Sequence, residues 1–198
     1  MATNAETAYE SIKGNVGLNN GTGDWFEVTQ ELINQFADVT HDHQFIHVDP
    51  ERAKAGPFGT TIAHGFLTLS LLVHLQGSLK GGDERPAPNF AGMVAGVNYG
   101  FDKIRFINPV KVNSRIRAKS VTKDIELKGN AINTTNTLTV EIEGEEKPAL
   151  VADWVDAGFL SPVDASGERV TTASTPDESK PSAAMARDVS VDQDEGGG

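Results

Sequence analysis

The chain of 198 residues contains no cysteine. Without thiols it cannot form a disulfide, use a cysteine nucleophile or bind a metal through thiolates. The amino-terminal stretch MATNAETAYESIKG also lacks the basic start and the apolar run of a secretory signal peptide. Both absences favour a cytoplasmic location, which we expect for this protein.

Basic residues and long apolar runs are scarce as well. Seventeen lysines and arginines stand against 28 aspartates and glutamates, which gives a net charge of -11. A nucleic-acid partner is not expected, because phosphate contacts need clustered basic side chains. No apolar stretch reaches the roughly 18 residues of a membrane-spanning helix, so no membrane anchor is expected either. The sequence also has no G-x-S-x-G motif and no glycine-rich nucleotide loop.

Large apolar residues are nearly absent from residues 161–198, which carry eight acidic and three basic residues. Such a composition cannot bury enough surface to offset the entropy of ordering, so it predicts a disordered acidic tail. Residues 1–23 are polar and end in the turn-rich NNGTG, which predicts a polar amino-terminal segment. Residues 24–160 then form a single domain.

Within this domain the hydrophobic pattern changes from helical to extended. A short strand and a helix are predicted in WFEVTQELINQFADVT, with Thr29 as N-cap, and a short helix in DPERAKAG, with Asp49 as N-cap. Residues 63–79 are apolar on all sides, which predicts a helix that is buried on most of its surface. Five strands are predicted after Phe90: FAGMVAGVNYG, FDKIRFINPV, SRIRAKSVTKDIEL, AINTTNTLTVEIE and ALVADWVDAGF. The expected fold class is α+β, with an antiparallel sheet curled around a central helix.

The loop THDHQFIH is the densest cluster of titratable groups, with His41, Asp42, His43 and His47. One interpretation is a Zn²⁺ or Fe²⁺ site, since imidazole and carboxylate suit these ions. A second is metal-free acid–base chemistry, in which Asp42 and His47 hold one water. A third is purely structural, with Asp42 in an Asx turn and His47 as a hydrogen-bonded core histidine. The residues by themselves leave these interpretations open.

A second group lies at the start of the apolar helix, in TTIAHGFLTLSLLVHL. Gly65 falls in the first turn, where backbone N–H groups have no acceptor within the helix and no side chain would block an approach. A preorganised donor of this kind contributes about 3 kcal/mol in known oxyanion holes. Asp42 and His47 facing the Gly65 N–H would form an addition–elimination site. His64, just before it, could equally serve only to hydrogen-bond the preceding loop.

The segment FADVTHDHQFIHVDPERAKAGPFGTTIAHGFLTLSLL resembles the motif of the MaoC-like, (R)-specific enoyl-CoA hydratase family. The later segment NYGFDKIRFINPVKVNSRIRA is similar to the strand pair that follows the helix in that family. The resemblance extends from about Trp25 to Phe159. This chain has His41 where the family often has glycine, and Gln44-Phe45 where it often has Asn-Pro.

The resemblance implies a hot-dog fold, a long helix wrapped by a curved antiparallel sheet, which usually dimerises into one continuous sheet. It implies reversible hydration of trans-2-enoyl thioesters to (R)-3-hydroxyacyl thioesters, with no cofactor and no metal. Asp42 and His47 would hold and activate the water, and the Gly65 N–H would bind the thioester oxygen. The partners implied are an acyl-CoA or acyl-carrier-protein thioester and a second copy of the chain.

Substrate contacts are also expected outside the motif. Lys103 and Arg105, followed by Arg115 and Arg117, could meet the CoA phosphates, although solvated charges on strands are the commoner case. His64 is also a candidate binding residue, and Phe45, Phe58 and Phe66 are candidates for the acyl site, each equally compatible with ordinary packing. Two rival functions are an acyl-CoA thioesterase of the same fold and a non-catalytic acyl-thioester-binding subunit.

Overall fold

The computed structural model describes residues 2–162, so the tail expected over 161–198 lies outside the described residues from position 163 onward. The helices are α1 (Asn4–Ile12), the 3-10 turn η1 (Lys13–Asn15), α2 (Gln30–Thr40), α3 (Phe45–Val48), α4 (Pro50–Lys54), α5 (Gly65–Ser70) and α6 (Leu72–Gln76). The strands are β1 (Asn19–Thr22), β2 (Phe26–Glu27), β3 (Met93–Phe106), β4 (Arg115–Lys128), β5 (Ala131–Ile142) and β6 (Leu150–Leu160).

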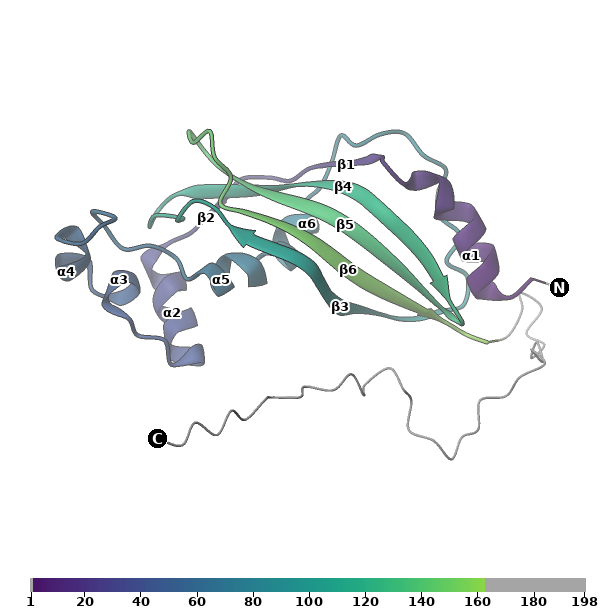
Figure 1. The fold of residues 1–198 in the computed structure, drawn as a ribbon, viewed down its shortest axis with the longest axis horizontal. Coiled ribbons are helices and arrows are strands. Elements are labelled where there is room, and N and C mark those ends of the chain that lie inside the picture. Colours follow the sequence, from purple (N-terminus) through teal and green to yellow (C-terminus); the bar gives the residue numbers. More distant parts are fainter. Residues whose placement is uncertain (1, 163–198) are drawn as a thin grey trace, which may run out of the picture.

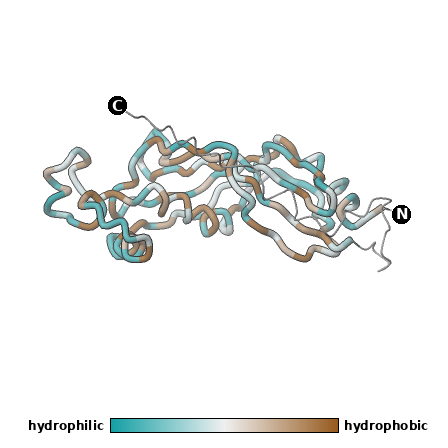
Figure 2. Tube along the Cα trace, turned by 60° about the horizontal axis from the view of Figure 1, so that its bottom comes forward, coloured by the Kyte–Doolittle hydropathy of each residue, from teal (hydrophilic) through white to brown (hydrophobic). Residues whose placement is uncertain are grey.

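The strands form one six-stranded antiparallel sheet in the order β1-β4-β5-β6-β3, and β2 also pairs with β4. The sheet is long and curved, with α1 near one end and α2, α3 and α4 beyond the other (Figure 1). Apolar and polar residues interleave along the chain, as expected for strands that bury one face (Figure 2). The α+β expectation is confirmed.

The core lies between the α5–α6 segment and the sheet. Leu67, Leu72 and Leu75 project from the two helices into one cluster with Leu138 and Leu150 of the sheet, and all five are at most 4% exposed. Burial of each such side chain contributes on the order of 2 kcal/mol. None of the helices in residues 2–162 has the length and apolarity needed to span a membrane.

The two predicted N-caps, Thr29 and Asp49, are confirmed. The Thr29 side chain accepts a hydrogen bond from the Leu32 N–H at 3.2 Å and begins α2. Asp49 accepts from the Arg52 N–H at 3.0 Å and begins α4, with Pro50 at the first helical position. Both caps act over three residues, and for that reason they can be recognised in the sequence.

The helix expected over residues 63–79 is shorter and interrupted. It starts at Gly65, turns at Leu71 and ends at Gln76. The Ser70 hydroxyl donates to the Phe66 carbonyl at 2.8 Å, a bond from residue i to i−4 that often bends helices. The expectation of burial on most sides is also wrong, because Phe66 and Val73 are 69% and 65% exposed.

The strand pattern differs from the prediction in two places. The first two strands expected after Phe90 are one continuous strand, β3, whose register shifts near Asn98 and Lys103. The segment 1–23, expected only to be polar, contains α1 and β1. Strand β1 pairs with β4, and α1 packs through Ala8 and Ile12 against the sheet near Leu160.

Candidate active site

The candidate site lies where α2, α3 and α5 come together at one end of the sheet. Asp42 is positioned by His41, which ends α2 in the left-handed conformation with φ 61°. Glycine adopts this conformation without strain, whereas other residues adopt it rarely. His41 therefore makes this turn at some cost in backbone strain, and the Asp42 side chain stays 55% exposed beside two buried histidines.

His47 lies in α3 and is 7% exposed. Its Nδ1 is 2.7 Å from the carbonyl oxygen of Ile62. A carbonyl can only accept, so Nδ1 carries the proton and the neutral ring keeps its lone pair on Nε2. Burial lowers the pKa of His47 and the nearby His64 lowers it further, while the Ile62 carbonyl and Asp42 oppose the shift. The net direction is downward, which keeps His47 neutral and able to accept a proton at pH 7.

His64 is the N-cap residue of α5 and is 3% exposed. The strand-like segment before it is fixed by two backbone bonds, Ile62 N–H to Ile46 O at 3.0 Å and Ala63 N–H to Val110 O at 2.8 Å. His64 Nε2 donates to the backbone carbonyl of Asp42 at 2.9 Å. The sequence suggested a bond to the loop directly before the helix, but the partner is Asp42, 22 residues earlier in the loop that follows α2.

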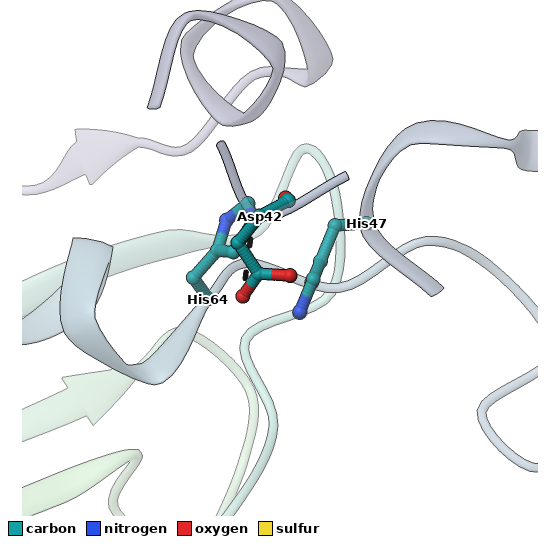
Figure 3. Close-up of side chains that lie close together, drawn as sticks. All are labelled: Asp42, His47 and His64. Carbon is teal, nitrogen blue, oxygen red and sulfur yellow. Dashed lines mark hydrogen bonds and ion pairs between the residues drawn. The ribbon is translucent and has the colours of Figure 1, made fainter. Parts of the chain in front are cut away.

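The two histidine rings stack, with centroids 3.7 Å apart and planes inclined by 26°. Phe36 of α2 covers His64 with a centroid distance of 5.1 Å. This leaves His64 Nδ1 buried, and it has no hydrogen-bond partner among the described residues. Figure 3 shows the Asp42 carboxylate beside both rings, so the loop and the helix start form one group, as the sequence predicts.

One ligand atom from each of Asp42, His47 and His64 can be chosen so that all lie within 4.8 Å of one another. This proximity would allow a metal ion, although His64 would be a ligand in place of His41 and His43, which the sequence suggested. His43 turns away and pairs with the exposed Asp38 at 2.9 Å. Imidazole lone pairs lie in the ring plane, so the two stacked rings direct theirs side by side rather than toward one point. The geometry favours acid–base chemistry over metal binding.

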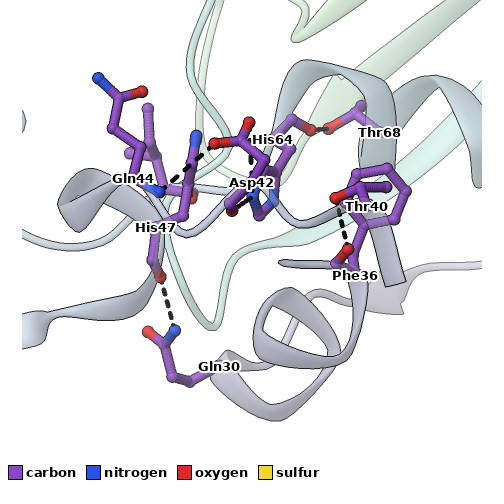
Figure 4. A network of polar contacts seen from close by, with 9 residues as sticks. Gln30, Phe36, Thr40, Asp42, Gln44, His47, His64 and Thr68 are labelled. Atoms are coloured by element: carbon purple, nitrogen blue, oxygen red, sulfur yellow. Dashed lines mark hydrogen bonds and ion pairs between the residues drawn. The ribbon is translucent and has the colours of Figure 1, made fainter. Parts of the chain in front are cut away.

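Residues that sequence reasoning missed hold the site in place (Figure 4). Gln30, at the start of α2, donates to the His47 carbonyl at 2.7 Å and accepts from the Thr61 hydroxyl. It thereby ties α3 to the segment that leads into α5. The Ile62 carbonyl that orients His47 is a backbone group, and no sequence pattern marks it.

Gly65 lies in the first turn of α5, as expected, although it is the first helical residue, and its missing side chain has an additional role. The Phe106 ring of β3 packs so closely that a Cβ on Gly65 would lie 3.1 Å from two of its atoms. Gly65, Phe58 and Phe106 line a cavity of about 260 Å³, together with Thr68 and Val110. Of the three phenylalanines expected at the acyl site, only Phe58 reaches this cavity.

The other expected binding residues lie elsewhere. Phe45 lies under the Arg52 guanidinium, 4.3 Å from its ring centre. Phe66 is exposed and meets Phe106 edge to face at 6.2 Å. Lys103 and Arg105 are exposed on β3, the edge strand of the sheet.

The basic residues of β4 are paired with carboxylates. Arg115 binds Glu143 at 3.0 Å and Arg117 binds Glu141 at 2.8 Å. Lys119 also reaches Glu141, at 2.6 Å, and together with Arg117 it lowers the pKa of that carboxyl against the opposing effect of burial. These arginines fit the interpretation as solvated strand charges better than a role in phosphate binding.

Comparison with known proteins adds independent findings. A family model described as "MaoC like domain" matches residues 13–143. The chain is 45% identical over 161 residues to Nodulation protein N of Rhizobium meliloti (strain 1021), covering 80% of this chain and 96% of that protein. It is 52% identical over 136 residues to 3-hydroxyacyl-thioester dehydratase Z of Mycobacterium tuberculosis (strain ATCC 25618 / H37Rv), covering 68% and 85%.

The solved structure of an (R)-hydratase from A. caviae superposes with a TM-score of 0.54 at 22% identity. The match covers 71% of this chain and 94% of that one. At this identity the likeness establishes the fold, and the expected hot-dog fold is confirmed.

Proposed function

The chain belongs to the MaoC-like dehydratase family, and from this premise we propose that it catalyses reversible hydration of trans-2-enoyl thioesters to (R)-3-hydroxyacyl thioesters. The observation that carries the proposal is the stacked His47–His64 pair beside Asp42, with the Ile62 carbonyl directing the His47 lone pair outward. The relative named as a 3-hydroxyacyl-thioester dehydratase supports the same chemistry.

In the proposed reaction Asp42 and His47 hold one water between them. The pair removes a proton from the water as its oxygen bonds to C3 of the enoyl group, and then returns a proton to C2. Because the pKa of His47 is lowered, the ring starts neutral and can accept that proton. In this scheme His64 does not touch the substrate. It positions Asp42 by donating a hydrogen bond to the backbone carbonyl of Asp42.

Negative charge develops on the thioester oxygen as water adds. We assign the Gly65 N–H as its donor, since this N–H lies in the first turn of α5 and has no acceptor within the helix. Fixed donors of this kind contribute about 3 kcal/mol in other enzymes. Acid–base groups and a backbone donor suffice for the chemistry, so the proposal includes no cofactor and no metal.

We also propose that the protein is a homodimer that acts in the cytoplasm on acyl-CoA or acyl-carrier-protein thioesters. Strand β3 is an unpaired edge of the sheet, and Val94, Val97 and Phe106 on it are at least 43% exposed. An exposed apolar edge favours pairing with a second copy. Lys103 and Arg105 on the same strand are our candidates for CoA phosphate contacts, and Phe58 is our candidate for acyl contact.

Crotonyl-CoA hydration, followed by loss of the enoyl ultraviolet absorbance, tests the function, and chiral analysis of the product tests the (R) assignment. Asp42→Asn and His47→Gln should each lower kcat at least about 100-fold. His43→Gln is the matched control, because His43 lies in the same loop but outside the cluster, and it should retain wild-type rates. A wild-type protein no faster than the two variants would refute the proposal.

Two outcomes of this assay correspond to the rival functions. Release of free CoA, detected with a thiol reagent, would indicate a thioesterase. Tight binding of the thioester without turnover, by a chain that purifies with a second subunit, would indicate a non-catalytic binding subunit. We expect neither outcome, because the relative named as a 3-hydroxyacyl-thioester dehydratase supports hydration instead.

A further inference from the structure

A second cavity, of about 420 Å³, lies at the end of the sheet that α1 covers, away from the candidate active site (Figure 1). Its walls come from α1, η1, β1, α6, β4, β5 and the segment 79–90 that follows α6. It shares no residue with the cavity beside Gly65, and no residue of the edge strand β3 lines it. The cavity is therefore separate from the proposed reaction and from the proposed dimer edge.

One wall of the cavity is polar, although it belongs to the face of the sheet that carries the core residue Leu138. Ser120 and Thr122 of β4 and Asn136 of β5 line it, and all three are at most 7% exposed. The Asn20 side chain of β1 connects them. Its Nδ2 lies 2.9 Å from the Ser120 hydroxyl oxygen and 3.1 Å from both the Thr122 hydroxyl oxygen and Asn136 Oδ1. Polar groups at this depth are costly unless they are paired.

Asn136 has a donor that the protein does not use. Its Oδ1 accepts from Asn20, which leaves Nδ2 as the other end of the amide. No acceptor for this nitrogen is found among residues 2–162, and it is not fully enclosed, so it opens into the cavity. The Thr134 hydroxyl, on the same face of β5, also lines the cavity. The unpaired Gln76 Oε1, by contrast, is fully enclosed and cannot meet a ligand.

A positive charge lies beside this unused donor. Arg85 lines the cavity and donates from its guanidinium to Oδ1 of Asn20, the same amide that holds Asn136. None of the ion pairs found in residues 2–162 includes Arg85. No aspartate, glutamate or histidine lines the cavity. The only charged group in the wall is therefore a cation, which favours an anionic ligand over a neutral or cationic one.

The rest of the wall is largely apolar. It is formed by Ile12 of α1, by Leu79, Pro88 and Phe90, and by Ile125 of β4. Ile12 and Ile125 are at most 7% exposed and belong to the cluster through which α1 packs on the sheet. Walls of this kind accommodate hydrocarbon groups. A ligand that matches the whole cavity combines an anionic end with an apolar body.

We propose that this cavity binds an aliphatic carboxylate. The carboxylate accepts from Asn136 Nδ2 and faces the Arg85 guanidinium, while the hydrocarbon chain packs against Ile12, Leu79 and Ile125. An alcohol of the same length lacks the charge-assisted bonds, and an amine places a second cation against Arg85. The proposal stands apart from the hydration reaction, since it concerns different residues and requires no turnover.

Hexanoate is the probe, and the readout is the side-chain NH₂ signals of Asn136 in heteronuclear NMR spectra of the full-length protein. These signals are assigned by their absence from the spectrum of Asn136→Leu. We expect them to shift saturably with hexanoate below about 10 mM. The affinity for hexanol should be about tenfold weaker, and hexylamine should give no saturable shift.

Arg85→Gln should weaken hexanoate binding about tenfold and leave hexanol binding unchanged, because the variant removes the charge alone. Arg85 is exposed, so its replacement does not disturb the buried part of the cavity. Lys147→Gln is the charge-matched control. Lys147 is exposed and lines neither this cavity nor the one beside Gly65, so the control should bind hexanoate as the wild type does.

Three results would overturn the proposal. The first is the absence of any saturable shift of the Asn136 signals with hexanoate, as expected if only water enters the cavity. The second is equal affinity for hexanoate and hexanol. The third is equal affinity for hexanoate in Arg85→Gln and Lys147→Gln, as expected if hexanoate binds beside Gly65 instead.

Discussion

Replacing His64 with phenylalanine separates its role in the site from its role in the fold. The new ring preserves the stacking on His47 and the contact with Phe36. It removes two polar atoms, Nε2, which donates to the Asp42 carbonyl, and Nδ1, which is buried and has no partner among the described residues. The perturbation is therefore almost purely polar.

The two polar effects oppose each other in the free energy of unfolding. Loss of the hydrogen bond to Asp42 costs about 1 kcal/mol, since water can replace the donor at this exposed residue. Removal of the unpartnered Nδ1 recovers a similar amount, because a buried acceptor without a donor costs about 1–3 kcal/mol. The net change in stability should stay within about 1 kcal/mol, as measured by denaturant unfolding.

Activity should respond much more strongly than stability to His64→Phe. The Asp42 loop loses its hydrogen bond from His64, and misplacement of a reacting group by about 1 Å can cost about 100-fold. We expect kcat for crotonyl-CoA hydration to fall at least about tenfold, with a smaller change in KM.

The pH dependence gives a readout that a merely structural role would not alter. His64 lowers the pKa of His47, so its removal should raise that pKa. A base with a higher pKa becomes protonated at higher pH, so the acid limb of the kcat/KM profile should move toward neutral pH. His74→Phe is the control, since His74 lies on the adjoining helix α6 and packs on Phe26, outside the site. A His64→Phe enzyme with wild-type kcat and an unshifted acid limb would refute the positioning role.

Two further substitutions test other parts of the structure. Gly65→Ala should change the free energy of unfolding by less than about 1 kcal/mol, because the half-exposed Phe106 ring can move by the few tenths of an ångström that the new Cβ requires. It should lower kcat/KM about tenfold, because the new Cβ crowds the donor N–H. Unchanged kinetics would argue against Gly65 as the donor. Leu72 is 1% exposed, so Leu72→Ala should lower the free energy of unfolding by about 2–5 kcal/mol in denaturant. Val39 is 81% exposed, so the control Val39→Ala should change it by no more than about 0.5 kcal/mol. Equal losses in the two variants would contradict the assignment of the core.

Local signals in the sequence were sufficient to predict the N-caps of α2 and α4 and the loop that contributes to the candidate site. The Thr29 and Asp49 caps depend on bonds that span three residues, and the structure has both. The family motif led to Asp42, His47 and Gly65, whose assigned roles remain proposals. The left-handed backbone of His41 could not be predicted from the sequence, because histidine adopts this conformation only rarely.

The sequence misjudged elements whose form depends on distant partners. The sequence of β1, NNGT, predicts a turn, because it has no large apolar residue and only one β-branched residue. The segment is extended in the structure because it pairs with β4, about 100 residues later in the chain. The single strand β3 was divided in two because its glycines and asparagine resemble a turn, whereas pairing with β6 carries the strand through them.

The sequence by itself determined the α+β class, the family and the residues that make up the loop and the helix start, because these depend on local periodicity and a compact motif. Only the tertiary structure decided that His64 bonds Asp42 and stacks on His47, that a backbone carbonyl orients His47, and that Phe106 covers Gly65. It also left Phe66 exposed on a helix that the sequence describes as buried. Such contacts join segments far apart in the chain, and no pattern within one segment encodes which partner it will meet.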